Sequence, residues 1–340
     1  MRAAVAAVAV VAVVVVVVRR RKCQWKPLEY SCLFGIVGGL GPKATSTFVN
    51  DLIQQRAMLF RIMQSASTPE ERFHKVASLL PSASFGWTLA QVEQVYHHTS
   101  QTNKLNDQDH VPLLVAQATS TPSRPRYILK HEDTEDPAPQ LRQVAQALTD
   151  AGATHLAIVC NTAHYFWPQM KPYLPRTVEF IDMIQLTLDY ISVKLPGCAR
   201  VGVLATLGTL ECGLIQGYAS RFEFFSPLDI SLAHQQQVER CIFGELGIKT
   251  GFDDPRTPQG RANLLLLLDQ CAEMKQQFDI QVVVLFCSEL PLVLFPDSLL
   301  RVLEEDPAMA TRLQGIQAYL DPSMLLVHEV LRLALCSRRV

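Results

Sequence analysis

Five short apolar runs recur along the chain and predict buried strands. They lie at residues 33–39, 111–118, 155–160, 200–206 and 280–287. Nearly continuous apolar strands are typical of a sheet that is covered on both faces. Between several of these runs, residues 139–152 and 261–278 have apolar side chains at helical spacing. The alternation of strands and helices predicts an α/β fold with mainly parallel sheets.

One pattern occurs twice. GIVGGLGPKAT at 35–45 and VGVLATLGTLE at 201–211 each read as an apolar strand, a turn of small residues and the start of a helix. Each is followed later by a strand that ends in a cysteine, Cys160 or Cys287. Ligands of parallel sheets bind beyond the carboxyl ends of the strands. We therefore predict two similar lobes, each a mainly parallel sheet flanked by helices, with the active site in the cleft between them.

The repeat also predicts the lobe boundaries. We expect a first lobe at 33–195, completed by the C-terminal segment 315–340, and a second lobe at 196–314. In the first lobe Gly35 and Cys160 are 125 residues apart, whereas in the second lobe the matching pair, Gly202 and Cys287, are 85 residues apart. This excess predicts an insertion at about 55–98.

Residues 1–22 differ from the rest of the chain. Positions 3–18 are sixteen consecutive alanines and valines, and four basic residues come directly after them. A membrane span needs about 20 residues, and a secretory signal carries its charge before the apolar stretch. If the segment inserts, the basic flank favours a cytosolic location for the rest of the chain. A membrane anchor and low-complexity sequence without a role both stay open, and we expect a cytoplasmic catalytic domain with either.

Composition excludes some functions. The chain has 31 basic and 32 acidic residues and a net charge of −1, which gives no electrostatic footprint for nucleic acid. Nine cysteines, an odd number without a CxxC pair, do not read as a disulfide framework. We expect free thiols in a reducing compartment. No cluster of histidines or carboxylates has metal-ligand spacing, so we expect no metal.

Two thiols facing one cleft suit proton transfer at carbon, which needs a base on one side and an acid on the other. An ordinary thiol has a pKa of about 8.5 and can be adjusted for either task. Cysteine with histidine would instead indicate acyl transfer, but His164 is not expected to reach the thiol of Cys160. The competing interpretation is a buried apolar role for the cysteines and a helix N-cap role for Asn161 or Thr162.

Cationic side chains could bind an acidic ligand. Arg124 and Arg126 lie in the proline-rich stretch TPSRPRYIL, where a guanidinium could grip a carboxylate with two hydrogen bonds. Lys249 in GIKTG is a second candidate. The alternative for each is a solvated surface side chain.

The glycine-rich stretch GIVGGLGP does not fit the dinucleotide-binding spacing G-x-G-x-x-G. Pro42 suits the first position of a helix. A tight turn that lines a small-molecule cleft is therefore favoured over phosphate binding.

These motifs together resemble the aspartate/glutamate racemase superfamily, and most closely its aspartate racemase branch. The resemblance is carried by GIVGGLGPKAT, CNTAH, CSELP, PSRPRYIL and IKTG, and it covers residues 33–54 and 99–335. The sequence departs from the branch at Ser288, where threonine is usual.

The resemblance implies racemisation without pyridoxal phosphate or any other cofactor, most specifically of L-aspartate to D-aspartate. Cys160 and Cys287 would be the two catalytic bases. The implied substrate-binding residues are Asn161, Thr162, Ser288 and Glu289 for the amino and α-carboxylate groups, Arg124 and Lys249 for the side-chain carboxylate, and Gly39 and Gly41 in the opening motif. Family members often form homodimers, so a homodimer is expected.

Three alternatives stay open. The substrate could be glutamate or another amino acid. The protein could be a decarboxylase or cis–trans isomerase of the same superfamily that uses one cysteine. It could also be a non-catalytic amino-acid-binding protein.

Overall fold

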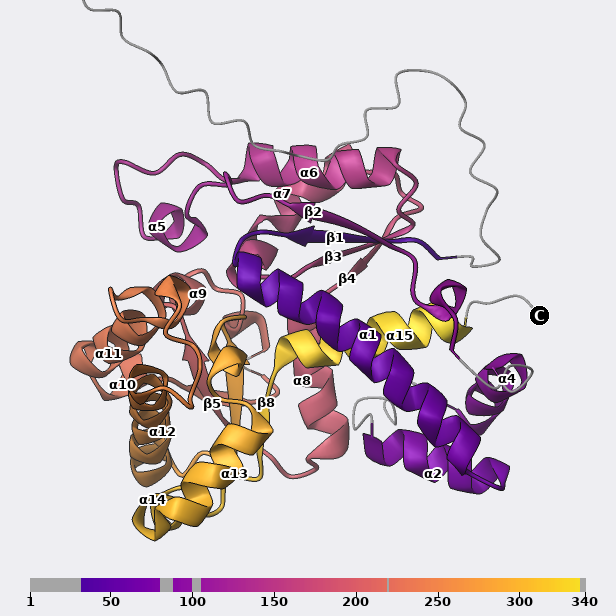
Figure 1. The fold of residues 1–340 in the computed structure, drawn as a ribbon. Helices are drawn as coiled ribbons and strands as arrows, with labels where there is room; N and C mark the ends of the chain where they lie inside the picture. The colour runs from indigo at the N-terminus through magenta and orange to yellow at the C-terminus, as the bar shows by residue number, and fades with distance from the viewer. Residues whose placement is uncertain (1–31, 80–87, 100–104, 219, 337–340) are drawn as a thin grey trace, which may run out of the picture.

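A computed structural model describes residues 32–79, 88–99, 105–218 and 220–336, and contains two four-stranded parallel sheets (Figure 1). The first has the order β2-β1-β3-β4, with β1 Phe34–Gly38, β2 Leu113–Gln117, β3 His155–Ile158 and β4 Glu179–Ile181. The second has the order β6-β5-β7-β8, with β5 Arg200–Ala205, β6 Glu223–Phe225, β7 Val282–Phe286 and β8 Ala318–Leu320. The same order in both sheets confirms the predicted pair of similar α/β lobes.

Helices cover the sheets. Those before β5 are α1 Pro42–Ser65, α2 Pro69–Leu79, α4 Leu89–Thr99, α5 Arg124–Ile128, α6 Ala138–Asp150, α7 Trp167–Met170 and α8 Met183–Lys194. Those after β5 are α9 Leu207–Glu211, α10 Pro227–Ile230, α11 Leu232–Phe243, α12 Pro258–Phe278, α13 Pro296–Glu305, α14 Pro307–Arg312 and α15 Pro322–Cys336. Short 3₁₀ turns are η1 Asp107–Asp109, η2 Thr162–Phe166, η3 Lys171–Tyr173, η4 Gln216–Tyr218, η5 Ile248–Thr250 and η6 Leu290–Leu292.

The inner strands are buried on both faces. In β7, Val282, Val284 and Phe286 face the core that the two lobes share, while Val283 and Leu285 face α11 and α12. This alternation follows from the period of two along a strand. It explains why the sequence shows a continuous apolar run rather than alternating polar positions.

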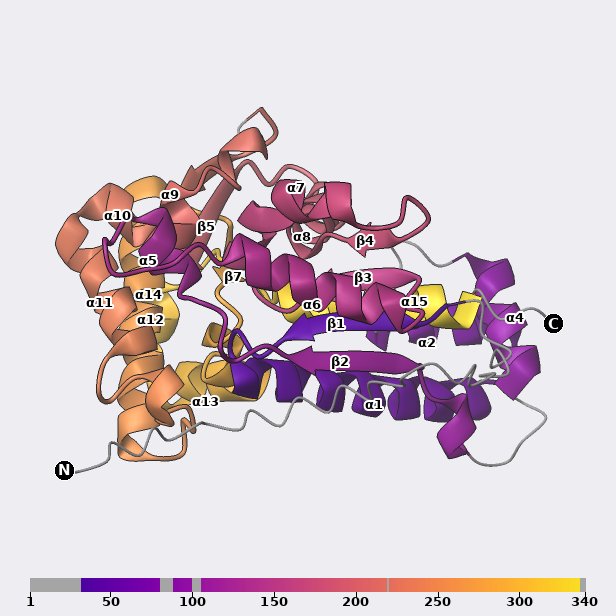
Figure 2. The same cartoon turned by 90° about the horizontal axis from the view of Figure 1, so that it is seen from above.

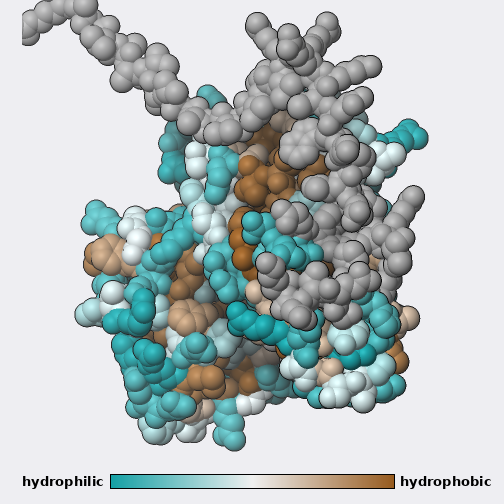
Figure 3. Space-filling model, turned by 45° about the vertical axis from the view of Figure 1, so that its right-hand side comes forward, coloured by the Kyte–Doolittle hydropathy of each residue, from teal (hydrophilic) through white to brown (hydrophobic). Residues whose placement is uncertain are grey.

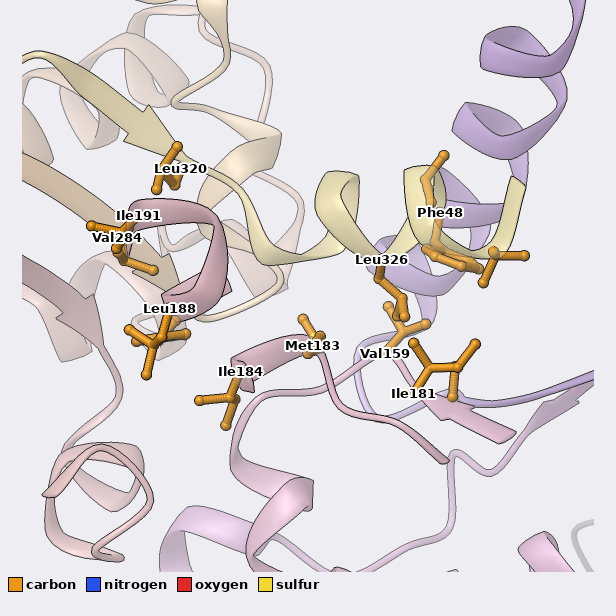
Figure 4. Close-up of a cluster of buried hydrophobic side chains, with 14 of the residues drawn as sticks. Phe48, Val159, Ile181, Met183, Ile184, Leu188, Ile191, Val284, Leu320 and Leu326 are labelled. Atoms are coloured by element: carbon orange, nitrogen blue, oxygen red, sulfur yellow. The ribbon is translucent and has the colours of Figure 1, made fainter. Parts of the chain in front are cut away.

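One apolar core joins the lobes. Figure 4 shows Val284 of the second sheet and Val159, just after β3 of the first, with Met183 of α8 and Leu326 of α15 between them. These side chains are fully buried, and each contributes about 1.5–3 kcal/mol relative to exposure. The lobes therefore share a large apolar contact.

The C-terminal segment is divided between the lobes. β8 pairs with β7 in the second sheet, while α15 packs against α1 and α8 of the first lobe. The prediction that all of 315–340 completes the first lobe is therefore wrong for β8. A three-residue strand has too few positions for the sequence to reveal its sheet.

The expected insertion forms a helical extension. α1 continues past residue 55 to Ser65, and α2 and α4 pack beside its far end, away from the second lobe (Figure 1). Leu59, Met63, Val76 and Val92 form a small core there. This extension lies far from the carboxyl ends of the strands.

The expected anchor at residues 3–18 lies outside the described residues and stays a prediction. Among the helices that the structure describes, none has the length and apolar character needed to cross a membrane. The face in Figure 3 is mostly hydrophilic at its lower edge and has apolar area nearer its centre.

Candidate active site

A small cavity lies between the lobes at the carboxyl ends of the strands. Its lining from the first lobe consists of Leu40, Ser123, Arg124, Pro125, Cys160, Asn161 and Thr162. The second lobe supplies Thr206, Phe243, Lys249, Cys287, Ser288 and Glu289. The cavity has a volume of about 50 Å³, which is room for a few water molecules. Of the catalytic and substrate-binding residues that the family resemblance implies, all but the two glycines line this cavity.

The two cysteines reach the cavity from opposite lobes. Cys160 follows β3 and Cys287 follows β7, and both are more than nine-tenths buried. Each of these strands pairs in parallel with the first strand of its own lobe. The repeated sequence pattern therefore becomes a repeated position in space, with one thiol at each wall.

Cys287 lies beside a carboxylate. Its Sγ donates a hydrogen bond to Oε2 of Glu289 at 3.2 Å, and Ser288 Oγ donates to the same oxygen at 3.3 Å. Burial raises the pKa of Cys287 well above its ordinary value, and the charge of Glu289 raises it further, against the opposing effect of Lys249. Cys287 is therefore a protonated thiol at neutral pH, which is the form that gives a proton.

Lys249 is paired rather than free. Its Nζ donates to Oε1 of Glu289 at 2.5 Å. Burial lowers the pKa of Lys249, but the negative charge of Glu289 and the hydrogen bond to it raise this pKa above its ordinary value. The site therefore keeps an ammonium group within reach of both thiols. Gly251, which has a φ of 102°, ends the η5 turn that carries the lysine.

His164 supports the backbone beside Cys160. Its Nδ1 donates to the carbonyl oxygen of Cys160 at 2.9 Å, and Nε2 lies 3.8 Å from Oδ1 of Asp182. Burial lowers the pKa of His164, although Asp182 opposes the change. The imidazole is therefore neutral and holds the turn through the carbonyl, in line with the expectation that it does not act on the thiol.

Several buried polar atoms at the cavity lack partners within the described part of the chain. They are both side-chain amide atoms of Asn161, which is 1% exposed, and Nε of Arg124. Asn161 precedes η2 but makes no capping bond with its side chain, so the N-cap alternative is wrong for this residue. Unsatisfied buried polar groups cost about 1–3 kcal/mol each. A polar ligand in the cavity could supply the missing partners.

Arg124 reaches the cavity on a short helix rather than a loop. Its Nη2 donates to the carbonyl of Leu40 at 2.6 Å and Nη1 to that of Pro122 at 3.2 Å. α5 extends from the first lobe to α9 of the second (Figure 2), and a side chain at Gly208 would lie 2.5 Å from Pro125. Arg126 instead pairs with an acidic residue at the surface and does not line the cavity.

Gly39 and Gly41 shape the wall without lining the cavity. Gly39 has a φ of 78°, and a Cβ there would clash with the backbone of Ala118. A Cβ at Gly41 would overlap the carboxylate of Glu289. The implied binding role of these glycines becomes a spatial one in this structure, because they leave room for other groups.

Sequence reasoning missed the polar supports of the second lobe. Thr206 lines the cavity, and the repeated pattern VGVLATLGT placed it at the end of a strand. Gln235 Nε2 donates to the carbonyl of Ala205 at 2.9 Å, and Glu239 accepts from the backbone N–H of Leu207 at 2.7 Å. No sequence signal links α11 to these backbone groups, because the contacts arise only from tertiary packing.

The described residues contain no group of three or more His, Cys, Asp or Glu side chains that could hold a metal ion. Each described cysteine is a free thiol. The arrangement can therefore offer two thiols, one ammonium, one guanidinium and several hydroxyls to a ligand.

The fold is similar to solved racemase structures. An aspartate racemase from Picrophilus torridus matches with a TM-score of 0.57 at 18% identity, covering 89% of this chain and 94% of that protein. An aspartate racemase homologue from Pyrococcus horikoshii OT3 matches with a TM-score of 0.53 at 16% identity, covering 89% and 98%. At such identities the likeness shows the fold alone. The sequence model of the Asp/Glu/hydantoin racemase family matches residues 92–305, more than half of the chain. The chain therefore belongs to the Asp/Glu/hydantoin racemase family.

Proposed function

We propose that this protein is a cofactor-independent amino-acid racemase that interconverts L- and D-aspartate. The observation that carries the proposal is the pair of buried thiols, Cys160 and Cys287, which line one small cavity from opposite lobes. A base on one side of a carbon and an acid on the other are what inversion by proton transfer requires. The family, the aspartate racemase from Picrophilus torridus and the aspartate racemase homologue from Pyrococcus horikoshii support the same reaction class.

Proton transfer follows from this arrangement. With one enantiomer, the thiolate of Cys160 takes the α-proton and the electron pair stays on the substrate. The thiol of Cys287 then gives its proton to the opposite face of the carbon and becomes a thiolate. The other enantiomer reacts in the reverse sense. Glu289 accepts a hydrogen bond from Cys287 and can stabilise its protonated form between turnovers.

The charges favour an acidic substrate. Arg124 and Lys249 bring two cationic groups to the cavity, against one carboxylate, that of Glu289. Aspartate has two carboxylates and one ammonium group, so its net charge complements this excess. The unpartnered amide of Asn161 can donate to a carboxylate and accept from an ammonium group.

The test is exchange of the α-hydrogen in deuterated water, started from each enantiomer and followed by NMR and circular dichroism. We expect wild-type protein to exchange and racemise both, and Cys160→Ala and Cys287→Ala to racemise at least about a hundredfold more slowly. Cys198→Ala, which changes a thiol outside the cavity, is the matched control. Wild-type racemisation by Cys160→Ala would contradict the two-base assignment.

The same spectra separate the alternatives. A decarboxylase would convert aspartate to a product one carbon shorter, and a cis–trans isomerase would leave both aspartate enantiomers unchanged. A protein that only binds amino acids would broaden or shift the substrate signals without exchange. Any of these results would count against racemisation.

A further inference from the structure

Three threonine hydroxyls form a chain that crosses between the lobes at the cavity wall. Thr209 Oγ1 lies 2.6 Å from Oγ1 of Thr162 in the first lobe and 3.0 Å from Oγ1 of Thr206 in its own lobe. Thr162 and Thr206 line the cavity, whereas Thr209 lies behind them and is fully buried. The two cavity hydroxyls are therefore joined through one hidden group.

Thr209 Oγ1 is buried, and among the described residues its hydrogen-bond partners are Thr162 and Thr206 alone, so its own proton goes to one of them and the hydroxyl chain has two arrangements. Each hydroxyl has one proton to donate and two lone pairs to accept. Either Thr206 donates to Thr209 and Thr209 to Thr162, or every donor points the opposite way. In the first arrangement only Thr162 has its proton free for the cavity, and in the second only Thr206 does. The backbone N–H of Thr209 donates to Thr206 Oγ1 at 3.3 Å and is compatible with both.

The two ends of the hydroxyl chain, Thr162 and Thr206, lie beside the cavity walls that carry the two thiols. Thr162 comes two residues after Cys160. Thr206 follows β5, whose last residue, Ala205, is paired with Phe286, the residue before Cys287. A switch of the hydroxyl chain thus moves one hydrogen-bond donor from the wall of one thiol to the wall of the other.

We propose that Thr209 is a positioning residue that makes Thr162 and Thr206 alternate as donor to the α-carboxylate of the substrate. The inference rests on the proposed racemase function. Removal of the α-proton moves negative charge onto that carboxylate, so a fixed donor stabilises the transition state more than the bound substrate. Because Thr209 connects the hydroxyls of Thr162 and Thr206, one of them is a donor for either enantiomer. The hydroxyl chain is oriented by its own hydrogen bonds and not by solvent.

The test compares Thr209→Val, which keeps the shape and loses the hydroxyl, with Thr209→Ser, which keeps the hydroxyl. We expect Thr209→Val to lower kcat about tenfold or more for both enantiomers, with KM changed less than about threefold. We expect Thr209→Ser to stay within about twofold of wild type. A purely structural role would give the opposite order, because valine fills the buried space and serine does not. Thr209→Ala replaces the valine variant if that variant does not fold.

Two results would overturn the inference: wild-type kcat in Thr209→Val, or equal losses in Thr209→Val and Thr209→Ser. Failure of the proposed function is seen separately, as absence of α-hydrogen exchange in wild-type protein. In that case the role of Thr209 is tested by calorimetric titration of wild type, Thr209→Val and Thr209→Ser with succinate, because binding needs no turnover. Affinity weakened about threefold in Thr209→Val alone supports the coupled donor, and equal affinities in all three proteins overturn it.

Discussion

Gly41→Ala is a change outside the cavity that should disable the site through Glu289. Gly41 has an extended backbone, with a φ of −147° and a ψ of 97°, which alanine adopts without strain. The added methyl group, however, would overlap Oε1 of Glu289 and lie 2.9 Å from its Cδ. The carboxylate must move, and Oε1 is the atom that accepts the 2.5 Å hydrogen bond from Lys249.

The expected loss in kcat/KM follows from the hydrogen bond between Lys249 and Glu289. A hydrogen bond to a charged group is worth about 1.5–3 kcal/mol, which corresponds to a loss of about tenfold to a hundredfold in kcat/KM. The assay is circular dichroism with each aspartate enantiomer, with thermal unfolding measured in parallel. Racemisation has an equilibrium constant of one, so kcat/KM must fall equally for both enantiomers. Gly217→Ala is the control, because a Cβ there meets nothing within 4 Å. Wild-type kcat/KM in Gly41→Ala would refute the reasoning.

Three further predictions concern other parts of the molecule. Burial raises the pKa of Asp321 from 3.8 to about 6, so the folded state binds its proton more tightly and loses stability as the pH rises from 4 to 6. Asp321→Asn should therefore gain stability relative to wild type across this window, by up to about 3 kcal/mol in denaturant titrations at each pH, and parallel curves would contradict this. Gly208→Ala should push α5 away and raise KM for aspartate through Arg124, while an unchanged KM would show that α5 tolerates the methyl group. Glu93→Gln removes the charge that binds Arg72 with two hydrogen bonds, and should speed hydrogen exchange in α2 and α4 while racemisation stays at the wild-type rate. Slower racemisation in Glu93→Gln would link the extension to the active site.

The sequence predicts the inner strands and the thiols well, because both follow from strong local signals. A short run rich in β-branched residues, such as IQVVVLFC, favours a strand inside a covered sheet, and its last residue then lies at the ligand-binding edge. The edge strands β4, β6 and β8 have three residues each and give no periodic signal.

The connections between site residues could not be predicted. Thr209 lies next to Thr162 only because α9 of one lobe faces η2 of the other, 47 positions away in the chain. The pairing of Lys249 with Glu289, 40 positions apart, likewise depends on how η5 packs against the end of β7. Residue types at strand ends indicate which groups enter a cleft, whereas their hydrogen bonds depend on side-chain packing across the lobe boundary.

The return of α15 to the first lobe has a consequence for synthesis on the ribosome. Phe48 of α1 is translated 278 residues before Leu326 of α15, which is part of its cover (Figure 4). The sheet of the second lobe can form around β5 and β7 before α15 is available to cover the first lobe. The second lobe should therefore complete its folding before the first lobe, which is the reverse of their order of translation. A nascent chain stalled before residue 322 should expose α1 to chaperones.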